Sequence, residues 1–65
     1  MKTVDFVRHL KNNQCQLYRE GGNHSIFINS ENKKLSSVPR HKEVKNNLVR
    51  KICKDLEIPF PSNFQ

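Results

Sequence analysis

Residues 15–28 of the chain read CQLYREGGNHSIFI, and this stretch decides the fold. In residues 15–20 the side chains alternate with a period of two, which is typical of a half-buried strand. One face of this predicted strand holds Cys15, Leu17 and Arg19. The run Gly21-Gly22-Asn23 follows, and these residue types accept the positive φ angles that a tight turn requires. The stretch therefore predicts the first half of a β-hairpin and its turn.

The period of two continues after the turn. Residues 24–28, His-Ser-Ile-Phe-Ile, predict a second strand with Phe27 on the face opposite to its two isoleucines. A polar turn at 29–32 leads to a third, weaker strand at 34–38, which Pro39 closes because proline cannot donate to a β-ladder. Three short strands joined by tight turns predict an antiparallel meander.

A helix is predicted on the N-terminal side of the meander, over residues 3–11. Its apolar residues recur at helical spacing, at Val4, Phe6, Val7 and Leu10. Thr3 is the expected N-cap. Asn12-Asn13 is expected to end the helix, since asparagine tolerates a left-handed C-terminal cap.

A second helix is predicted after residues 40–45, which form a basic loop. Asn46 or Asn47 is the expected cap, and the broad apolar face consists of Leu48, Val49, Ile52, Cys53 and Leu56. Two prolines favour an extended tail over residues 59–65. We expect Phe60 and Phe64 in this tail to fold back onto the body of the protein, with a frayed tail as the alternative.

These elements predict an α+β fold of order α-β-β-β-α. Neither helix can bury its apolar stripe alone, so the simplest arrangement packs both helices on one face of the three-stranded antiparallel sheet. The other face then remains open to solvent or to a partner. With 65 residues, we expect a single domain over residues 1–65.

Several protein classes are excluded by composition. The longest apolar run is Ile26-Phe27-Ile28, far below the ~20 residues that span a bilayer, so no membrane association is expected. No apolar stretch follows the N-terminal residues, so we expect no signal peptide. Cys15 and Cys53 are too few for a disulfide scaffold and are expected to be reduced, buried thiols of a cytosolic protein.

The charge is concentrated in one third of the chain. The net charge is +6, yet residues 33–54 alone hold eight Lys or Arg against one Glu, a net +7. A lysine-rich helix is often only a solubilising surface, but this asymmetry favours a phosphate-binding surface for nucleic acid. The candidate RNA-binding residues are Lys33, Lys34, Arg40, His41, Lys42, Lys45, Arg50, Lys51 and Lys54.

His24 is the candidate catalytic residue. It opens a strand directly after a turn of small residues, and a histidine titrates near neutrality, so it can move a proton to or from a ribose oxygen. Taken alone, an exposed histidine at a strand end is more often an ordinary polar surface residue. The supporting turn would consist of Gly21, Gly22, Asn23 and Ser25. The histidines and cysteines are too widely spaced for a metal motif, so we expect no metal and no small-molecule cofactor.

Three segments resemble those of HicA toxins. Residues 22–27, GNHSIF, resemble the family's G-S-H-x-x-[F/Y] segment. Residues 38–41, VPRH, resemble its V-P-x-H segment, and residues 48–52, LVRKI, resemble its L-R-x-I-L segment. Asn23 stands where the family usually has Ser, and Ser25 stands where many members have a second His. The resemblance covers nearly the whole chain in the same order.

This resemblance implies a bacterial, cytoplasmic mRNA interferase of a type II toxin–antitoxin pair, with a double-stranded-RNA-binding-domain-like fold. It implies that His24 is catalytic, that single-stranded mRNA is the substrate, and that a HicB-like antitoxin covers the histidine. The alternative that the residues leave open is a non-catalytic RNA-binding or protein-interaction module that uses the same basic surface.

Overall fold

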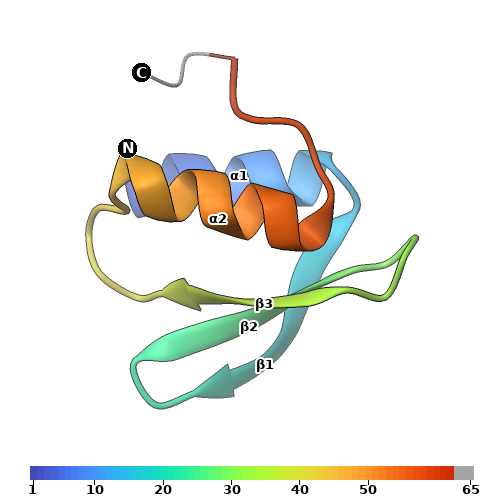
Figure 1. Ribbon diagram of the computed structural model, residues 1–65. Helices are drawn as coiled ribbons and strands as arrows, with labels where there is room; N and C mark the ends of the chain where they lie inside the picture. Colours follow the sequence, from blue (N-terminus) through green and yellow to red (C-terminus); the bar gives the residue numbers. More distant parts are fainter. Residues whose placement is uncertain (63–65) are drawn as a thin grey trace.

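The fold is a three-stranded antiparallel sheet covered on one side by two helices. The computed structural model describes residues 1–62. In chain order it contains α1 (Thr3–Asn12), β1 (Cys15–Gly21), β2 (His24–Asn29), β3 (Leu35–Pro39) and α2 (Asn46–Leu56). β2 is the central strand and pairs antiparallel with both neighbours. Both helices lie on the same side of the sheet (Figure 1). The predicted order and layering are confirmed.

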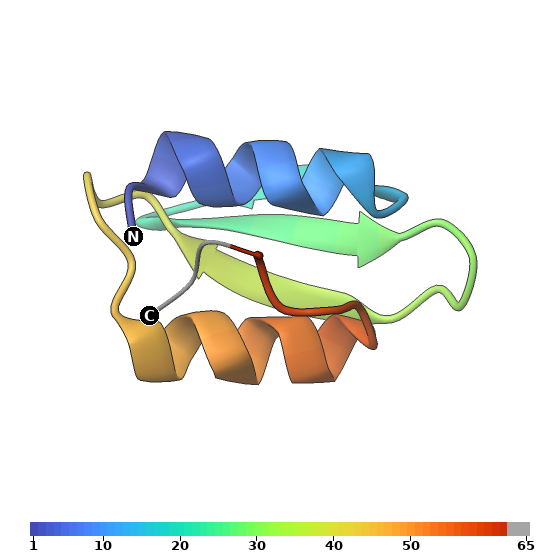
Figure 2. The ribbon, with the colours of Figure 1, turned by 90° about the horizontal axis from the view of Figure 1, so that it is seen from above.

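The two helices run side by side in the same direction, and β2 starts at the end of the sheet where both helices begin (Figure 2). The core lies between the helices and the sheet. Its buried side chains are Phe6, Leu10, Cys15, Phe27, Val38, Val44, Val49, Ile52, Cys53, Leu56 and Ile58. All of the predicted face of α2 is in this core except Leu48, which is only partly buried and packs against it. This packing fixes the position of β2 below the helices.

A bulge in β1 changes which side chains face the helices. Leu17 pairs with Phe27, whereas Arg19 pairs with Ile26, so Tyr18 is an extra residue on the β1 side. Simple alternation had predicted that Arg19 and Leu17 share one face of β1. Because of the bulge, the two side chains lie on opposite faces. Only Cys15 of β1 is buried, and Leu17 remains 46% exposed. The prediction of a half-buried strand was thus wrong beyond the first residue.

The start of α1 also differs from the prediction. Thr3 is the first helical residue and Lys2 is the flanking residue. The Thr3 hydroxyl donates to the carbonyl oxygen of His41, and its backbone N–H donates to Lys42 O at 3.0 Å. Thr3 therefore ties the helix to the basic loop and does not cap it. Val4 is 63% exposed, so the apolar stripe of α1 is narrower than predicted.

The end of α1 uses a side chain as its cap. The helix ends at Asn12 as expected, but Asn13 has φ −119° and the left-handed residue is Gln14, with φ 64°. The reason is that the Asn13 amide donates to the carbonyl oxygen of His9 at 2.8 Å. A terminal carbonyl is satisfied in this way without a left-handed residue at position 13.

At the start of α2, as at the start of α1, the predicted cap residue lies inside the helix. Asn46 is the first helical residue and Lys45 precedes it, so neither predicted asparagine is the flanking cap. At the other end Glu57 has φ 58°, and the N–H of Ile58 donates to Cys53 O at 3.0 Å. This is the pattern of a Schellman motif, and it returns Ile58 to the core.

The tail turns back across the helices. Pro59 O lies 2.7 Å from Nε2 of His9, and Pro61 is buried, so the tail follows the body as far as it is described. Phe60 is 52% exposed, so its ring is only partly covered by the rest of the protein. The expectation for Phe64 lies outside the described residues.

Candidate functional site

His24 is held at the end of the central strand. It pairs with Gly21 of β1 on one side and with Pro39 of β3 on the other. The turn before it is short because Gly22 adopts a φ of 51°, where a side chain would be strained. The backbone of His24 is therefore held between two strands, while its side chain is exposed. This combination suits a group that must meet a large substrate in a defined orientation.

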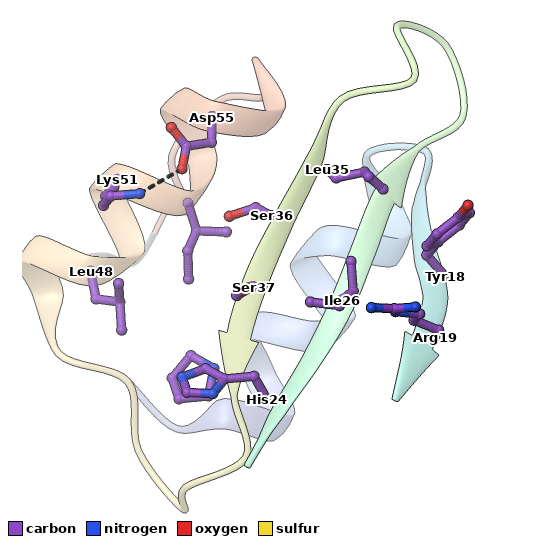
Figure 3. Close-up of a pocket in the computed structure, with 12 residues that line it drawn as sticks. Tyr18, Arg19, His24, Ile26, Leu35, Ser36, Ser37, Leu48, Lys51 and Asp55 are labelled. Atoms are coloured by element: carbon purple, nitrogen blue, oxygen red, sulfur yellow. Dashed lines mark hydrogen bonds and ion pairs between the residues drawn. The ribbon is translucent and has the colours of Figure 1, made fainter. Parts of the chain in front are cut away.

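The imidazole lines an open pocket of about 660 Å³ (Figure 3). Every strand contributes to this pocket, and so does α2. Its lining residues from the strands include Tyr18, Arg19, His24, Ile26, Ser36 and Ser37. Those from α2 are Leu48, Lys51, Ile52 and Asp55. The pocket is thus an open surface depression between β3 and α2 that continues onto the sheet.

Two cations and one carboxylate line this pocket together with His24. Lys51 Nζ donates to Oδ2 of Asp55 at 2.8 Å, along one face of α2. Arg19 reaches the same pocket from β1 because the bulge places it opposite Ile26. Simple alternation missed Arg19. Counting the register backwards from the two-residue turn would have placed it opposite Ile26.

The predicted basic residues do not all gather around His24. Among them only Lys51 lines the pocket with the histidine. Lys34 pairs with Glu57 at 3.7 Å, and Arg40 pairs with Glu20 at 3.5 Å. The other predicted basic residues lie on the β2–β3 turn, on the loop after β3 and on α2. They are Lys33, Lys42, Lys45, Arg50 and Lys54, all outside the pocket lining.

The backbone of the basic loop is tied to the N-terminus. Val44 N–H donates to Met1 O at 2.8 Å, and the terminal ammonium donates to Val44 O at 3.2 Å. The neighbouring residues Lys2 and Glu43 form an isolated antiparallel bridge. The loop thus has a fixed backbone, while its Lys42 and Lys45 side chains are exposed.

The remaining histidines lie elsewhere. His9 contacts the tail through Pro59 O and stacks with Phe6 at a ring separation of 6.4 Å. His41 is exposed on the basic loop and does not line the pocket of His24. Neither His9 nor His41 lines the pocket that contains His24.

Both cysteines are free and buried, as predicted. Burial raises the pKa of the Cys53 thiol to about 11, and the neighbouring Cys15 adds to the shift. Burial likewise raises the pKa of Cys15. Thiols of this kind are poor nucleophiles at neutral pH because the thiolate is the reactive form. They belong to the core and not to the site.

Within residues 1–62, no group of three or more His, Cys, Asp or Glu side chains is arranged to hold a metal ion. In the same residues, neither helix has the length and apolar character needed to cross a bilayer.

Sequence comparison gives the family. Over residues 4–58 the chain matches the family described as "HicA toxin of bacterial toxin-antitoxin". No curated protein and no solved structure gave a significant match. The matched region runs from the first turn of α1 to the residue that closes α2, and it includes His24 and the whole pocket lining. The chain therefore belongs to the HicA toxin family of bacterial toxin–antitoxin systems.

Proposed function

We propose that this toxin is an endoribonuclease that cleaves mRNA in the bacterial cytoplasm, with His24 as its general acid or base. The observation that carries the proposal is the position of His24. Its backbone is held between two strands, and its exposed side chain lines an open pocket that also contains Lys51 and Arg19. A positioned histidine beside cations is the minimum that phosphodiester cleavage by proton transfer requires.

The proposed reaction uses the 2′-hydroxyl of the RNA as nucleophile and needs no bound cofactor or metal. The 2′-oxygen attacks the adjacent phosphorus and loses its proton, and the bond to the 5′-oxygen breaks as that oxygen gains a proton. The products are a 2′,3′-cyclic phosphate and a 5′-hydroxyl end. His24 carries out one of the two proton transfers. The second transfer is not assigned to His41, because this histidine does not line the pocket.

The cations have an electrostatic role in this proposal. Negative charge builds up on the phosphoryl oxygens during the attack, and a nearby ammonium or guanidinium stabilises it. Lys51 and Arg19 both line the pocket and would supply this positive charge. The exposed basic residues outside the pocket, among them Lys42, Lys45 and Lys54, would bind the RNA backbone to either side.

An open pocket also agrees with a single-stranded substrate and with inhibition by a protein. Membership of a family of toxin–antitoxin toxins implies a cognate antitoxin partner. We propose that a HicB-like antitoxin binds over the pocket, covers His24 and so prevents access of mRNA. The likeness to a double-stranded-RNA-binding domain belongs to the same proposal.

The test in cells is induction of the wild-type toxin beside His24→Ala and His41→Ala. We expect the wild type and His41→Ala to arrest growth and deplete bulk mRNA, because His41 lies outside the pocket. His24→Ala, expressed at the same level, should do neither. Equal growth arrest and mRNA loss with His24→Ala would overturn the assignment of His24.

A matched pair of lysines tests the role of the pocket cation. Lys51 and Lys54 are both exposed on α2, but only Lys51 lines the pocket. We expect Lys51→Ala to slow RNA cleavage by about tenfold or more, whereas Lys54→Ala should mainly weaken RNA binding. Equal effects of the two substitutions on the cleavage rate would remove Lys51 from the site.

The alternative function is a non-catalytic module that binds RNA or protein through the same surface. The spread of exposed cations over α2 and the basic loop favours it as the second candidate. It predicts salt-sensitive RNA binding without cleavage products, even after long incubation of the purified protein.

A further inference from the structure

A polar cluster lies beside the turn that precedes His24 and has no part in the chemistry described above. Nη1 of Arg40 donates to the carbonyl oxygen of Gly22 at 3.0 Å. The backbone N–H of the same arginine donates to Asn23 O at 3.1 Å. One residue after β3 thus binds both residues of the β1–β2 turn.

The cluster continues onto the two strands that meet at this turn. Nη1 of Arg40 lies 3.5 Å from Oε1 of Glu20, near the end of β1. The same Oε1 accepts a hydrogen bond from the Ser25 hydroxyl at 2.8 Å. Glu20 and Ser25 are directly paired across the two strands, and Ser25 is the residue after His24. The cluster therefore contacts the chain on both sides of His24.

This end of the hairpin needs such contacts to hold its conformation. Gly21 and Gly22 are the two most permissive residues of the strand end, and β1 is an edge strand whose side chains here are exposed. A catalytic side chain must be held within about 0.5 Å of its productive position. An exposed ion pair adds little to overall stability, so the value of this cluster is in holding the turn.

We propose that Arg40 and Glu20 are positioning residues for His24, and that they act by fixing the β1–β2 turn. The inference rests on the proposed nuclease function. It also revises the role expected for Arg40 from the sequence. Its guanidinium is engaged by a carboxylate and a carbonyl, which are groups that compete with an RNA phosphate.

The test compares the steady-state RNA cleavage of wild type with Glu20→Gln, Arg40→Gln, Arg40→Lys and the Glu20→Gln/Arg40→Gln double variant. Each single substitution is expected to lower kcat by about tenfold while KM changes by less than about twofold. The kcat of the double variant should be no lower than that of the slower single variant, because Glu20 and Arg40 contribute to the same interaction with the turn. Arg40→Lys should also be impaired, since the lysine side chain is one atom shorter and does not bring its nitrogen to the position of Nη1, which makes both contacts.

A phosphate contact predicts a different pattern. Arg40→Gln would raise KM with a strong salt dependence, Arg40→Lys would restore binding, and Glu20→Gln would tighten it by removing a negative charge. That pattern would overturn the proposal. Lys42→Gln, a loss of one exposed cation on the same loop, serves as the matched control and should affect only KM.

A measurement without RNA separates this inference from the proposed function. Amide exchange and ¹⁵N relaxation are followed by NMR for residues 21–25 and for α2. Both Glu20→Gln and Arg40→Gln should increase motion at 21–25 and shift the His24 ring resonances, with α2 unchanged. If the wild type proves unable to cleave RNA, the proposed function fails, but this experiment still shows whether Arg40 and Glu20 fix the β1–β2 turn. Unchanged dynamics and unchanged His24 ring resonances in the variants would overturn the positioning role.

Discussion

Nζ of Lys51 lies 2.8 Å from Oδ2 of Asp55, and both side chains line the pocket that contains His24 (Figure 3). The two residues are four positions apart on α2, so the pair is an ordinary helical ion pair in its geometry. Its location is what distinguishes it. A carboxylate inside a pocket proposed to bind RNA offsets one of the cations on which binding depends.

Removal of this carboxylate should therefore strengthen RNA binding. We expect Asp55→Asn to lower the Kd for a single-stranded RNA by about threefold or more at low salt, because Lys51 is then free to meet a phosphate. The gain should decrease as salt rises, since added ions screen the charge. Fluorescence anisotropy with labelled RNA measures the effect.

The matched control is Glu57→Gln. Glu57 also pairs with a lysine, Lys34, but lies outside the pocket lining. The same change in net charge there should alter the Kd much less. Equal gains from Asp55→Asn and Glu57→Gln would show that total charge, and not the pocket, governs binding.

The buried thiol of Cys53 predicts a loss of stability in alkali. Its pKa is raised from 9.0 to about 11, so the unfolded chain loses this proton at a lower pH than the folded protein. The contribution of Cys53 is fully present below pH 9 and is lost as the pH rises towards 11. It amounts to a free energy of unfolding on the order of 2 kcal/mol. Urea unfolding of wild type and Cys53→Ala between pH 8 and about 11 isolates it. An identical decline in both proteins would contradict the prediction.

Asn29 predicts a stability effect that is unrelated to the site. It is the one buried polar side chain among the described residues, and its amide donates to Leu56 O at 2.8 Å. Its oxygen accepts the N–H of Glu31 at 2.9 Å. Asn29→Ala removes one hydrogen bond from Leu56 O and one from the Glu31 N–H, and it should lower the free energy of unfolding by about 2 kcal/mol. Exposed Asn47 is the control, and Asn47→Ala should change stability by less than about 0.5 kcal/mol. Equal unfolding midpoints for the two variants would refute the role of Asn29.

Local patterns in the sequence were sufficient for the order of the elements. The spacing of the apolar residues in α2 defines a buried face for one helical geometry only, and the structure buries Val49, Ile52, Cys53 and Leu56. The Gly-Gly-Asn run predicted the turn before His24 because its residues accept conformations that others avoid. Each of these signals lies within a few residues of the feature that it predicts.

The errors occurred where distant parts of the chain compete for a group. Thr3 was expected to cap α1, yet its hydroxyl bonds to His41 O, 38 positions away. Arg19 was placed on the wrong face because the bulge at Tyr18 interrupts the alternation. Arg40 is predicted from the sequence to contact RNA, and its partners Glu20 and Gly22, which meet it only in the folded protein, support the positioning role proposed above. No local pattern reports the contacts of Thr3 and Arg40, whereas the register counted back from the turn would have placed Arg19.

The central claim is that His24 carries out proton transfer in RNA cleavage. The most direct measurement is cleavage of a defined single-stranded RNA by purified wild type and His24→Ala in the presence of EDTA, with the product ends identified by mass spectrometry. Both proteins are first compared by NMR to establish that the fold is retained. We predict 5′-hydroxyl and 2′,3′-cyclic phosphate ends from the wild type and none from His24→Ala. Equal amounts of the same products from both proteins would contradict the claim.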